Sequence, residues 1–486
     1  MAGIGFTLKK LFKEEYITTK IKAYIYSGLV VAGPWIASVL TVNVLLIITE
    51  NYLKDVSQKN LFMGTIVYSF VFSQIITAPW QILITRYISD KLYKKEYEYV
   101  RASFNGISRL LFFKTYIVGF IYYYKININL YYKFMAISLF VFISLTWIVM
   151  VYLSAIKNYL IISYAYICGG IVSVLVHIVF LNYPIQFKDN IVSSNLLLSY
   201  LIGIIVTYTF LSYSFFSTFY FTNNKEYDFL RYLSKFWKLF YVGLFYNVGL
   251  WIDNILVWYS QLGVDVFKIY RYSPIYDSAV FLAYLTVIPT MIFFMVFVET
   301  EFYDAYKKYY FLAMSSGRYE DIELSKEEMK NILYKQMVYI MEMQTIVTLT
   351  IIVISGKVFS HLGIFMIIRD IFRITSLGAL CSIFILIIIL IFLYFDEKDK
   401  ALIISLLFLI LNALFTLYFI PKGIEFYGLG YFISSFVTLI ISIITVVRFL
   451  KYINYYTFAK QPLFIQKEKG IFVNIANAIN NMEKGE

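Results

Sequence analysis

The sequence predicts an all-α polytopic membrane protein with about twelve transmembrane helices, and two observations carry this prediction. Hydrophobic residues make up 60% and charged residues 15% of the 486 residues, whereas soluble domains hold roughly 45–50% apolar residues. The apolar residues also gather in runs of about 20 residues or more, the length that an α-helix needs to cross a bilayer. Lipid offers no hydrogen-bond partner to the backbone, so these runs are expected to be helices.

Twelve apolar runs, separated by charged or polar residues, are the expected spans. They cover residues 22–48, 61–88, 103–124, 132–156, 159–182, 195–221, 236–260, 276–300, 333–355, 371–394, 399–420 and 426–449. The first run is much longer than the apolar core of a signal peptide and has no small-residue cleavage site, so we expect it to be a retained helix.

The positions of lysine and arginine orient the expected spans. With both termini inside, the inner segments carry about 29 of the 42 Lys and Arg residues and the outer loops carry about 11. This excess favours two cytoplasmic termini, and an even number of spans agrees with it. The formal charge of +12 is then explained by cytoplasmic loops that face anionic lipid, so no nucleic-acid partner is expected.

A polar segment divides the chain into two blocks of six spans. This segment, 222–235, is the expected cytoplasmic linker between a first bundle at 22–221 and a second bundle at 236–449. We find no clear sequence repeat between the blocks, although many transporters rock one such bundle against another. The N-terminal segment 1–21 mixes lysines with apolar residues at helical spacing and is expected to lie in the headgroup plane. The tail, 450–486, is expected in the cytoplasm.

The longest inner loop, 301–332, is charged. Ser325 and Glu328 form an S-x-x-E pattern, which predicts a helix start that leads into the ninth span. This loop is the best candidate for a surface that contacts a cytoplasmic partner. A solvated connector would have the same composition.

Ionised side chains inside the spans are the first candidates for a transport path. A charge at the bilayer centre costs at least about 2.5–3.5 kcal/mol, so each one is expected to face protein or water. The first six spans hold no Asp or Glu, while Arg109 and Lys114 lie in the third and Asp253 lies well inside the seventh. Asp253 is a candidate coupling-ion ligand, proton carrier or substrate contact. The alternative is a structural ion pair with a base such as Lys114.

The other path candidates have two readings each. Trp35 and Trp251 have apolar faces that stack on sugar rings, although most membrane tryptophans anchor the interface. Arg109 is near enough to the inner surface to snorkel. The candidate path residues are therefore Asp253, Trp251, Asn254, Lys114, Arg109 and Trp35.

Prolines inside the spans are candidate gates. Gly33 and Pro34 in the first span, Pro79 in the second and Pro289 in the eighth remove a backbone hydrogen bond and bend a helix. A bent helix is either a gate beside a cavity or a fixed packing kink.

Candidate markers of the cytoplasmic edge are Arg86, Asp90, Glu299 and Glu301. The two histidines and two cysteines lack the spacing of a metal site or a disulfide framework, so no metal and no cofactor are expected.

The chain has no P-loop and no D-x-D motif, and no loop is much longer than thirty residues. A membrane-embedded glycosyltransferase is therefore disfavoured, and no catalytic residue is assigned. A transporter remains, since a channel would need a short filter loop. The acid-free first six spans argue against the kind of cation-coupled multidrug exporter that places a carboxylate in its first bundle.

The chain also resembles a known family. Its opening, Met-Ala-Gly-Ile-Gly-Phe-Thr-Leu-Lys-Lys-Leu at 1–11, is similar to the start of the PelG family of Pel exopolysaccharide transporters. Further similar pieces follow in order: Gly33-Pro34-Trp35; Thr85-Arg86-Tyr87 with Asp90 and Leu92-Tyr93; Trp251-Ile252-Asp253; Pro289-Thr290, then Glu299-Thr300-Glu301-Phe302-Tyr303; Leu393-Tyr394-Phe395-Asp396; and Tyr427-Gly428-Leu429-Gly430. The pieces span nearly the whole chain, and their order and spacing are more specific than any one of them.

The resemblance implies a multidrug/oligosaccharidyl-lipid/polysaccharide exporter with two six-helix lobes around a central cavity, in a bacterial inner membrane. It implies export of Pel, a biofilm polymer rich in N-acetylgalactosamine, by alternating access or threading through that cavity. The implied partners are a cytoplasmic glycosyltransferase and the scaffold and cyclic-di-GMP receptor subunits of the same system. A lipid-linked oligosaccharide flippase and a multidrug exporter remain alternatives. The family offers no catalytic residue set to carry over.

Overall fold

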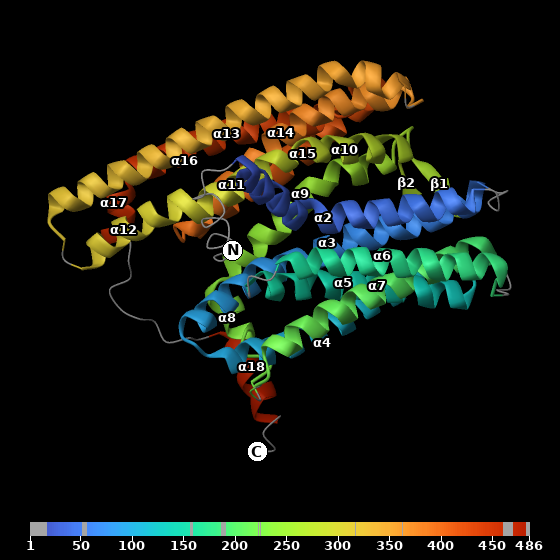
Figure 1. Cartoon of the computed structure of the whole chain (residues 1–486), viewed down its shortest axis with the longest axis horizontal. Coiled ribbons are helices and arrows are strands. Elements are labelled where there is room, and N and C mark those ends of the chain that lie inside the picture. Colours follow the sequence, from blue (N-terminus) through green and yellow to red (C-terminus); the bar gives the residue numbers. More distant parts are fainter. Residues whose placement is uncertain are drawn as a thin grey trace. The chain divides into compact units, whose positions relative to one another are not determined.

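The computed structural model describes residues 17–50, 56–155, 159–185, 191–221, 223, 225–315, 317–361, 363–459 and 470–482. Within these residues, eleven helices are long and apolar enough to cross a membrane (Figure 1). Residues 1–16, which hold most of the expected interfacial segment, lie outside the described part.

Each of the twelve expected spans forms a helix. The helices are α2 (Ile17–Thr49), α3 (Val56–Tyr93), α4 (Tyr97–Tyr124), α5 (Leu130–Ala155), α6 (Tyr159–Asn182), α7 (Ile191–Thr218), α9 (Trp237–Trp258), α10 (Pro274–Thr286) with α11 (Ile288–Phe297), α13 (Tyr319–His361), α14 (Met366–Tyr394), α15 (Lys398–Phe419) and α16 (Leu429–Lys451). Only α4, which carries Arg109 and Lys114, is not among the eleven apolar helices of the described residues. The all-α membrane fold is thereby confirmed.

The chain divides into two compact units, and α9 contributes to both. In the described residues, the N-terminal unit holds 32–251, 263–272 and 470–482, and the C-terminal unit holds the rest. This division falls inside α9, after Trp251. The first half of α9 lies against α3 because Gly243 has no side chain. A Cβ on Gly243 would lie 2.6 Å from the Ala78 carbonyl oxygen.

The N-terminal unit is built around α5, which is largely buried between α3, α4 and α7. Helices α6 and α7 pack closely because Gly169 and Gly203 face each other, and a Cβ on either would collide with the other's carbonyl oxygen. A short helix, α8 (Leu230–Lys235), follows the linker, and the C-terminal helix α18 (Ile471–Met482) packs on it.

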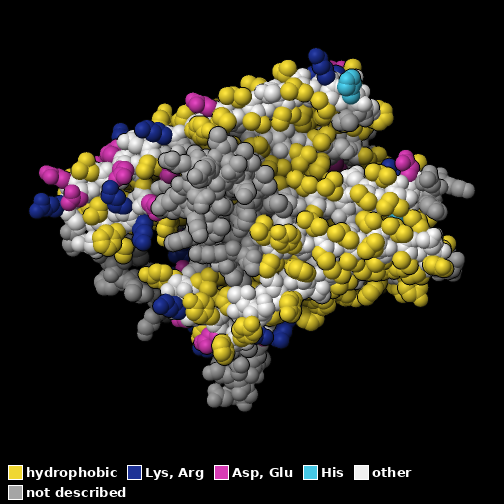
Figure 2. Space-filling view, viewed as in Figure 1, with side chains coloured by type: hydrophobic (Ala, Val, Ile, Leu, Met, Phe, Trp, Pro, Cys, Tyr) yellow, Lys and Arg dark blue, Asp and Glu magenta, His cyan; other side chains and the backbone are white. Residues whose placement is uncertain are grey.

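The C-terminal unit is built around α14, which is buried against α10 and α16. Helix α12 (Tyr303–Met314) packs beside the first part of α13, and the Tyr309 hydroxyl donates to Asn454 Oδ1 of α17 (Ile453–Phe458) at 3.0 Å. Figure 2 shows charged side chains gathered over the α12 end of this unit, while hydrophobic side chains cover the middle of α13. The 43 residues of α13 extend about 65 Å, twice the hydrocarbon thickness of a bilayer, so one end projects beyond the membrane.

The predicted helix start at Ser325 is wrong. Helix α13 begins at Tyr319, with Glu320 and Asp321 in a first turn that favours acidic residues. Ser325 lies inside the helix, where its buried hydroxyl donates to the Ile322 carbonyl at 2.9 Å. Glu328 instead accepts from Lys308 of α12 at 2.6 Å.

A β-hairpin that the sequence analysis missed follows α9. Strands β1 (Val264–Val266) and β2 (Tyr270–Tyr272) are antiparallel, with a turn in which Phe267 and Lys268 have positive φ. The Tyr68 hydroxyl on α3 donates to the Arg271 carbonyl at 2.8 Å and accepts from its N–H at 3.1 Å. The hairpin therefore belongs to the N-terminal unit, although α10, which follows it, belongs to the C-terminal unit.

Candidate functional site

Asp253 is held in the interior of the C-terminal unit by neutral donors. Its side chain lies on α9 and is 1% exposed. The Tyr276 hydroxyl donates to its Oδ2 at 2.8 Å, and the Asn412 amide on α15 donates to its Oδ1 at 3.2 Å. Thr416 in turn donates to Asn412 Oδ1 at 3.1 Å, which orients the amide so that its N–H group faces Asp253.

A second carboxylate, Asp277 on α10, lies beside this group. The Asn254 amide donates to its Oδ1 at 2.7 Å, the Trp258 indole donates at 2.9 Å, and the Ser273 backbone N–H donates to its Oδ2 at 3.2 Å. Ser273 also caps α10, since its hydroxyl accepts from the Tyr276 N–H at 3.3 Å. Sequence reasoning missed Asp277 because an acid in the first turn of a helix usually balances the helix dipole.

The two carboxylates have no basic partner among the described ion pairs, so all the donors identified around them are neutral. Asn254 Oδ1 is buried and has no hydrogen-bond partner in the part of the chain that the structure describes. Ionised acids inside membrane-spanning helices are costly, and intramembrane acids of this kind mark proton relays and ion paths. We call Asp253, Asn254 and Asp277 the carboxylate pair site.

Two other predicted path residues lie in the N-terminal unit, in separate environments. The Trp251 indole donates to Gln74 on α3 at 3.0 Å. Arg109 on α4 pairs with Glu226 in the linker at 2.7 Å, and its side chain is 58% exposed. Arg109 therefore joins a helix to the linker.

The remaining two path candidates are Lys114 and Trp35. Lys114 is exposed on α4, on a face where Phe113 and Ile117 are also exposed. Trp35 is half-buried on α2. The structure therefore gathers Asp253 and Asn254 into one site and leaves the other four predicted residues in the other unit, away from that network of hydrogen bonds.

The prolines of α2 and α3 do not interrupt their helices. Gly33 and Pro34 lie inside α2, and the Ser38 hydroxyl donates to the Pro34 carbonyl at 2.9 Å. Pro79 is buried in α3 at the point where Gly243 of α9 crosses it.

Pro289 does coincide with a break. Helix α10 ends at Thr286 and α11 begins at Ile288, so the eighth span consists of two pieces. Gln344, a buried residue of α13, donates to the Thr286 carbonyl at 2.8 Å and accepts from the Thr290 hydroxyl at 2.5 Å. The Gln344 side chain thus hydrogen-bonds to polar groups on both sides of the break. The sequence analysis did not identify this residue.

A turn of π-helix, η1 (Val298–Phe302), follows α11, and such turns occur often at functional sites. It contains Glu299, whose side chain lies outside the described set, and Glu301. Glu301 is exposed and accepts from Gln336 of α13 at 2.7 Å.

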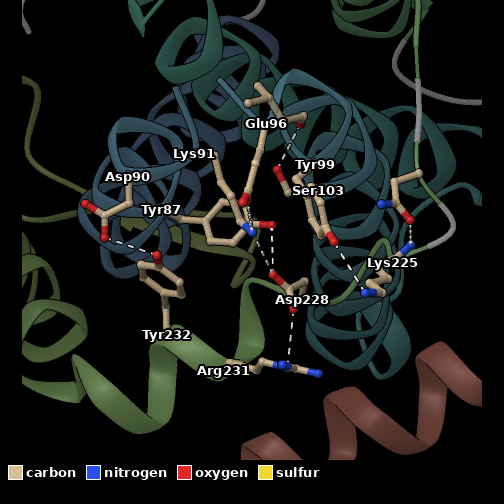
Figure 3. Close-up of polar contacts among 12 residues, drawn as sticks. Tyr87, Asp90, Lys91, Glu96, Tyr99, Ser103, Lys225, Asp228, Arg231 and Tyr232 are labelled. Carbon is tan, nitrogen blue, oxygen red and sulfur yellow. Dashed lines mark hydrogen bonds and ion pairs between the residues drawn. The ribbon is translucent and has the colours of Figure 1, made fainter. Parts of the chain in front are cut away.

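A charged network, which we call the linker cluster, surrounds the end of α3 in the N-terminal unit (Figure 3). Lys91 donates to Glu96 at 2.7 Å and lies 3.4 Å from Asp228 of the linker. Asp228 also pairs with Arg231 of α8 at 3.3 Å. The predicted edge residue Asp90 accepts from the Tyr232 hydroxyl at 3.0 Å.

Arg86, the second predicted edge residue of α3, is 3.3 Å from Asp90 and lies over the Phe236 ring. The hydrogen bond from Lys91 lowers the pKa of Glu96, and burial, reinforced by the Asp90 charge, raises the pKa of Tyr232. Together these contacts fasten the linker and α8 to the end of α3.

Comparisons with known proteins agree with this architecture. A family model described as "PelG: Putative exopolysaccharide Exporter (EPS-E)" matches residues 1–458. A comparison with curated proteins finds no match.

Several solved transporters have a similar fold. An outward-facing multidrug resistance MATE family transporter of the MOP superfamily is 14% identical with a TM-score of 0.59, covering 89% of this chain and 96% of that one. A MOP superfamily transporter from Pyrococcus furiosus is 13% identical with a TM-score of 0.58, covering 88% and 96%. The MATE transporter ClbM in complex with Rb+ is 12% identical with a TM-score of 0.51, covering 88% and 95%. These similarities show the fold of the superfamily.

Proposed function

Because the chain belongs to the PelG family of exopolysaccharide exporters, we propose that it carries a Pel-type polymer, rich in N-acetylgalactosamine, across a bacterial inner membrane into the biofilm matrix. The observation that carries this proposal is the match of the family model over residues 1–458 of a chain with the exporter-superfamily fold. The excess of Lys and Arg in the inner loops supports a cytoplasmic position for both termini.

The carboxylate pair site supports a role in driving export. In the described hydrogen bonds, Asp253 and Asp277 accept only from neutral donors. Each can therefore lose its charge by taking up a proton without leaving a basic partner buried and unpaired. The unpartnered Asn254 Oδ1 adds a third oxygen, and oxygen ligands are those that hard cations prefer. A proton or small cation taken up at this site would change the charge of the C-terminal unit during each cycle of alternating access, or during threading.

Two alternatives come from other classes of protein. A lipid-linked oligosaccharide flippase would use the same fold on a shorter substrate. A cation-coupled multidrug exporter is favoured by the fold of the MATE family transporter, whose resemblance at 14% identity extends to the fold alone. A membrane-embedded glycosyltransferase would need a nucleotide-sugar site, for which the sequence offers no motif.

We propose that the tip of the α12–α13 hairpin is a docking surface for the cytoplasmic glycosyltransferase that makes the polymer. Large apolar side chains are exposed at its tip, among charged neighbours: Phe311, Met314, Tyr319 and Leu324. An exposed apolar patch with a charged rim is typical of a protein contact site. The scaffold and cyclic-di-GMP receptor subunits are further proposed partners.

The test compares cells that lack the chain with cells in which it is restored. We expect N-acetylgalactosamine polymer to disappear from the cell surface without the chain and to return with it. Unchanged surface polymer, together with increased sensitivity to cationic drugs, would favour multidrug export. For the docking surface, a photo-crosslinker at Leu324 is expected to capture a glycosyltransferase, with exposed Lys357 at the other end of α13 as the control position. Equal capture at both positions would contradict the docking proposal.

A further inference from the structure

The C-terminal helix α18 is docked on the linker helix α8 by one of its faces. Val473 and Ala476 are buried where α18 packs on α8. The Arg231 guanidinium of α8 donates to Asn477 Oδ1 of α18 at 2.6 Å. Just before α18, Gly470 has a positive φ of 146°, and a Cβ there would lie 3.0 Å from Ser234 Oγ. The helix is therefore attached to the N-terminal unit through the same residue, Arg231, that belongs to the linker cluster.

A second face of α18 is apolar and exposed. Ile471 is 75% exposed, Phe472 41% and Ile475 39%. At 100° per residue these three side chains lie within about 100° of one another around the helix, next to the docked face. Asn474 is exposed on the remaining, polar face. An isolated apolar face of this kind, on a helix that is not a span, needs an apolar surface to cover it.

The direction of α18 fits a membrane surface. Figure 1 shows α18 running across the direction of α4, α5 and α7, at the end of these helices where α8 lies. A helix that crosses the spans at their ends lies parallel to the bilayer plane. The linker and α8 belong to an inner segment in the proposed topology, so the plane is that of the cytoplasmic leaflet.

The charge of the preceding segment fits the same surface. The residues directly before α18 in the sequence, 466–469, include Lys467 and Lys469 against one acid, Glu468. The cytoplasmic leaflet is anionic, and each lysine or arginine near it is attracted by the surface potential. An apolar face flanked by lysines is the pattern of a helix that lies in the headgroup region.

We propose that α18 lies on the anionic cytoplasmic leaflet, with Ile471, Phe472 and Ile475 inserted at the boundary of headgroups and acyl chains, and that the lysine-rich sequence before it adds to the attraction. Since α18 is docked on α8, the lipid surface then holds the linker at a fixed depth. This inference goes beyond the proposed export function, because it concerns a lipid-binding surface and rests only on the inner position of the linker.

The test uses the full-length protein in nanodiscs. After the native cysteines Cys168 and Cys381 are replaced by Ala, an environment-sensitive fluorophore is attached at Ile475→Cys, and at Asn474→Cys as the matched control on the polar face. In discs with anionic lipid, acyl-chain bromine is expected to quench the label at 475 at least about twofold more than the label at 474, and aqueous iodide is expected to show the reverse order.

Three outcomes would overturn the proposal. The first is an equal response of the two labels to bromine and iodide in anionic discs. The second is bromine quenching at 475 that is as strong in zwitterionic discs, which would remove the role of the lysines. The third is a label at 475 that responds to a second copy of the chain, detected by energy transfer between labelled copies, and does not respond to lipid. Because this readout needs no polymer, failure of the export proposal does not affect it.

Discussion

Replacing Asp253 separates its structural role from its role in transport. Asp253→Ala leaves the Tyr276 hydroxyl and the Asn412 amide without their acceptor, and each buried unsatisfied donor costs about 1–3 kcal/mol. We therefore expect a loss of about 2–6 kcal/mol and a large drop in abundance.

Asp253→Asn has the same shape and keeps one acceptor oxygen, so only one of the two donors loses its partner. It also removes a charge whose burial in a span costs at least about 2.5–3.5 kcal/mol, and this gain offsets the lost hydrogen bond. We expect near-normal abundance and thermal stability in detergent, with surface polymer reduced at least about tenfold, because residue 253 can no longer change its charge.

The assay measures surface polymer per unit of protein, with thermal stability measured on the same purified variants. Asp265→Asn is the matched control, since Asp265 is an exposed acid of the β1–β2 hairpin that bonds only to its own turn in the contacts described, through the Lys268 N–H at 2.8 Å. Normal export by Asp253→Asn at normal abundance would refute the reasoning.

Three further predictions concern the scaffold. Gln344→Leu leaves the Thr286 carbonyl and the Thr290 hydroxyl unpaired at the break in the eighth span, and is expected to cost about 1–3 kcal/mol in thermal unfolding. The control is Gln336→Leu at a half-buried position of α13, which removes one hydrogen bond to the exposed Glu301 and should cost less than half of this. Gly243→Ala brings a Cβ within 2.6 Å of a backbone oxygen of α3 and is expected to cost about 1–3 kcal/mol, so a melting temperature equal to that of the native chain would contradict the close approach. The pKa of Glu96 is lowered in the folded state by Lys91, so the pair stabilises the fold above the ordinary carboxyl pKa of 4.5 and loses this effect as the pH falls below it. Glu96→Gln should therefore lower stability slightly at pH 7, by less than about 1 kcal/mol, and by less than this at pH 3. An equal effect at both values would argue against the pair.

The sequence predicted the spans well because the bilayer selects them by length and hydropathy. Asp253 could be singled out for the same reason, since an acid deep in an apolar run is costly wherever it lies. Pro289 was also visible in the sequence, whereas its partner Gln344 was not. The contact forms only because α13 brings Gln344 to the same depth in the membrane as the break beside Pro289. Hydropathy does not encode this depth.

Other features were hidden for local reasons. In the sequence, Asp277 has the position of an ordinary acid in the first turn of a helix. Only the hydrogen bonds from Asn254 and Trp258 of α9 show that it lies in the same site as Asp253. The S-x-x-E pattern at Ser325 lies in a helix that an earlier acidic turn begins. The strands of the hairpin are three residues each, too short for an alternating pattern to be recognised.

In the proposed cycle, the carboxylate pair takes up a proton or small cation, and this uptake is coupled to movement of a polysaccharide. The most direct measurement follows ion flux in liposomes that contain the purified full-length protein and a pH- or sodium-sensitive dye, on addition of N-acetylgalactosamine oligosaccharide. We expect flux that depends on the sugar and that is lost when Asp253→Asn and Asp277→Asn are combined. Equal sugar-dependent flux in the native chain and in the double variant would contradict the account.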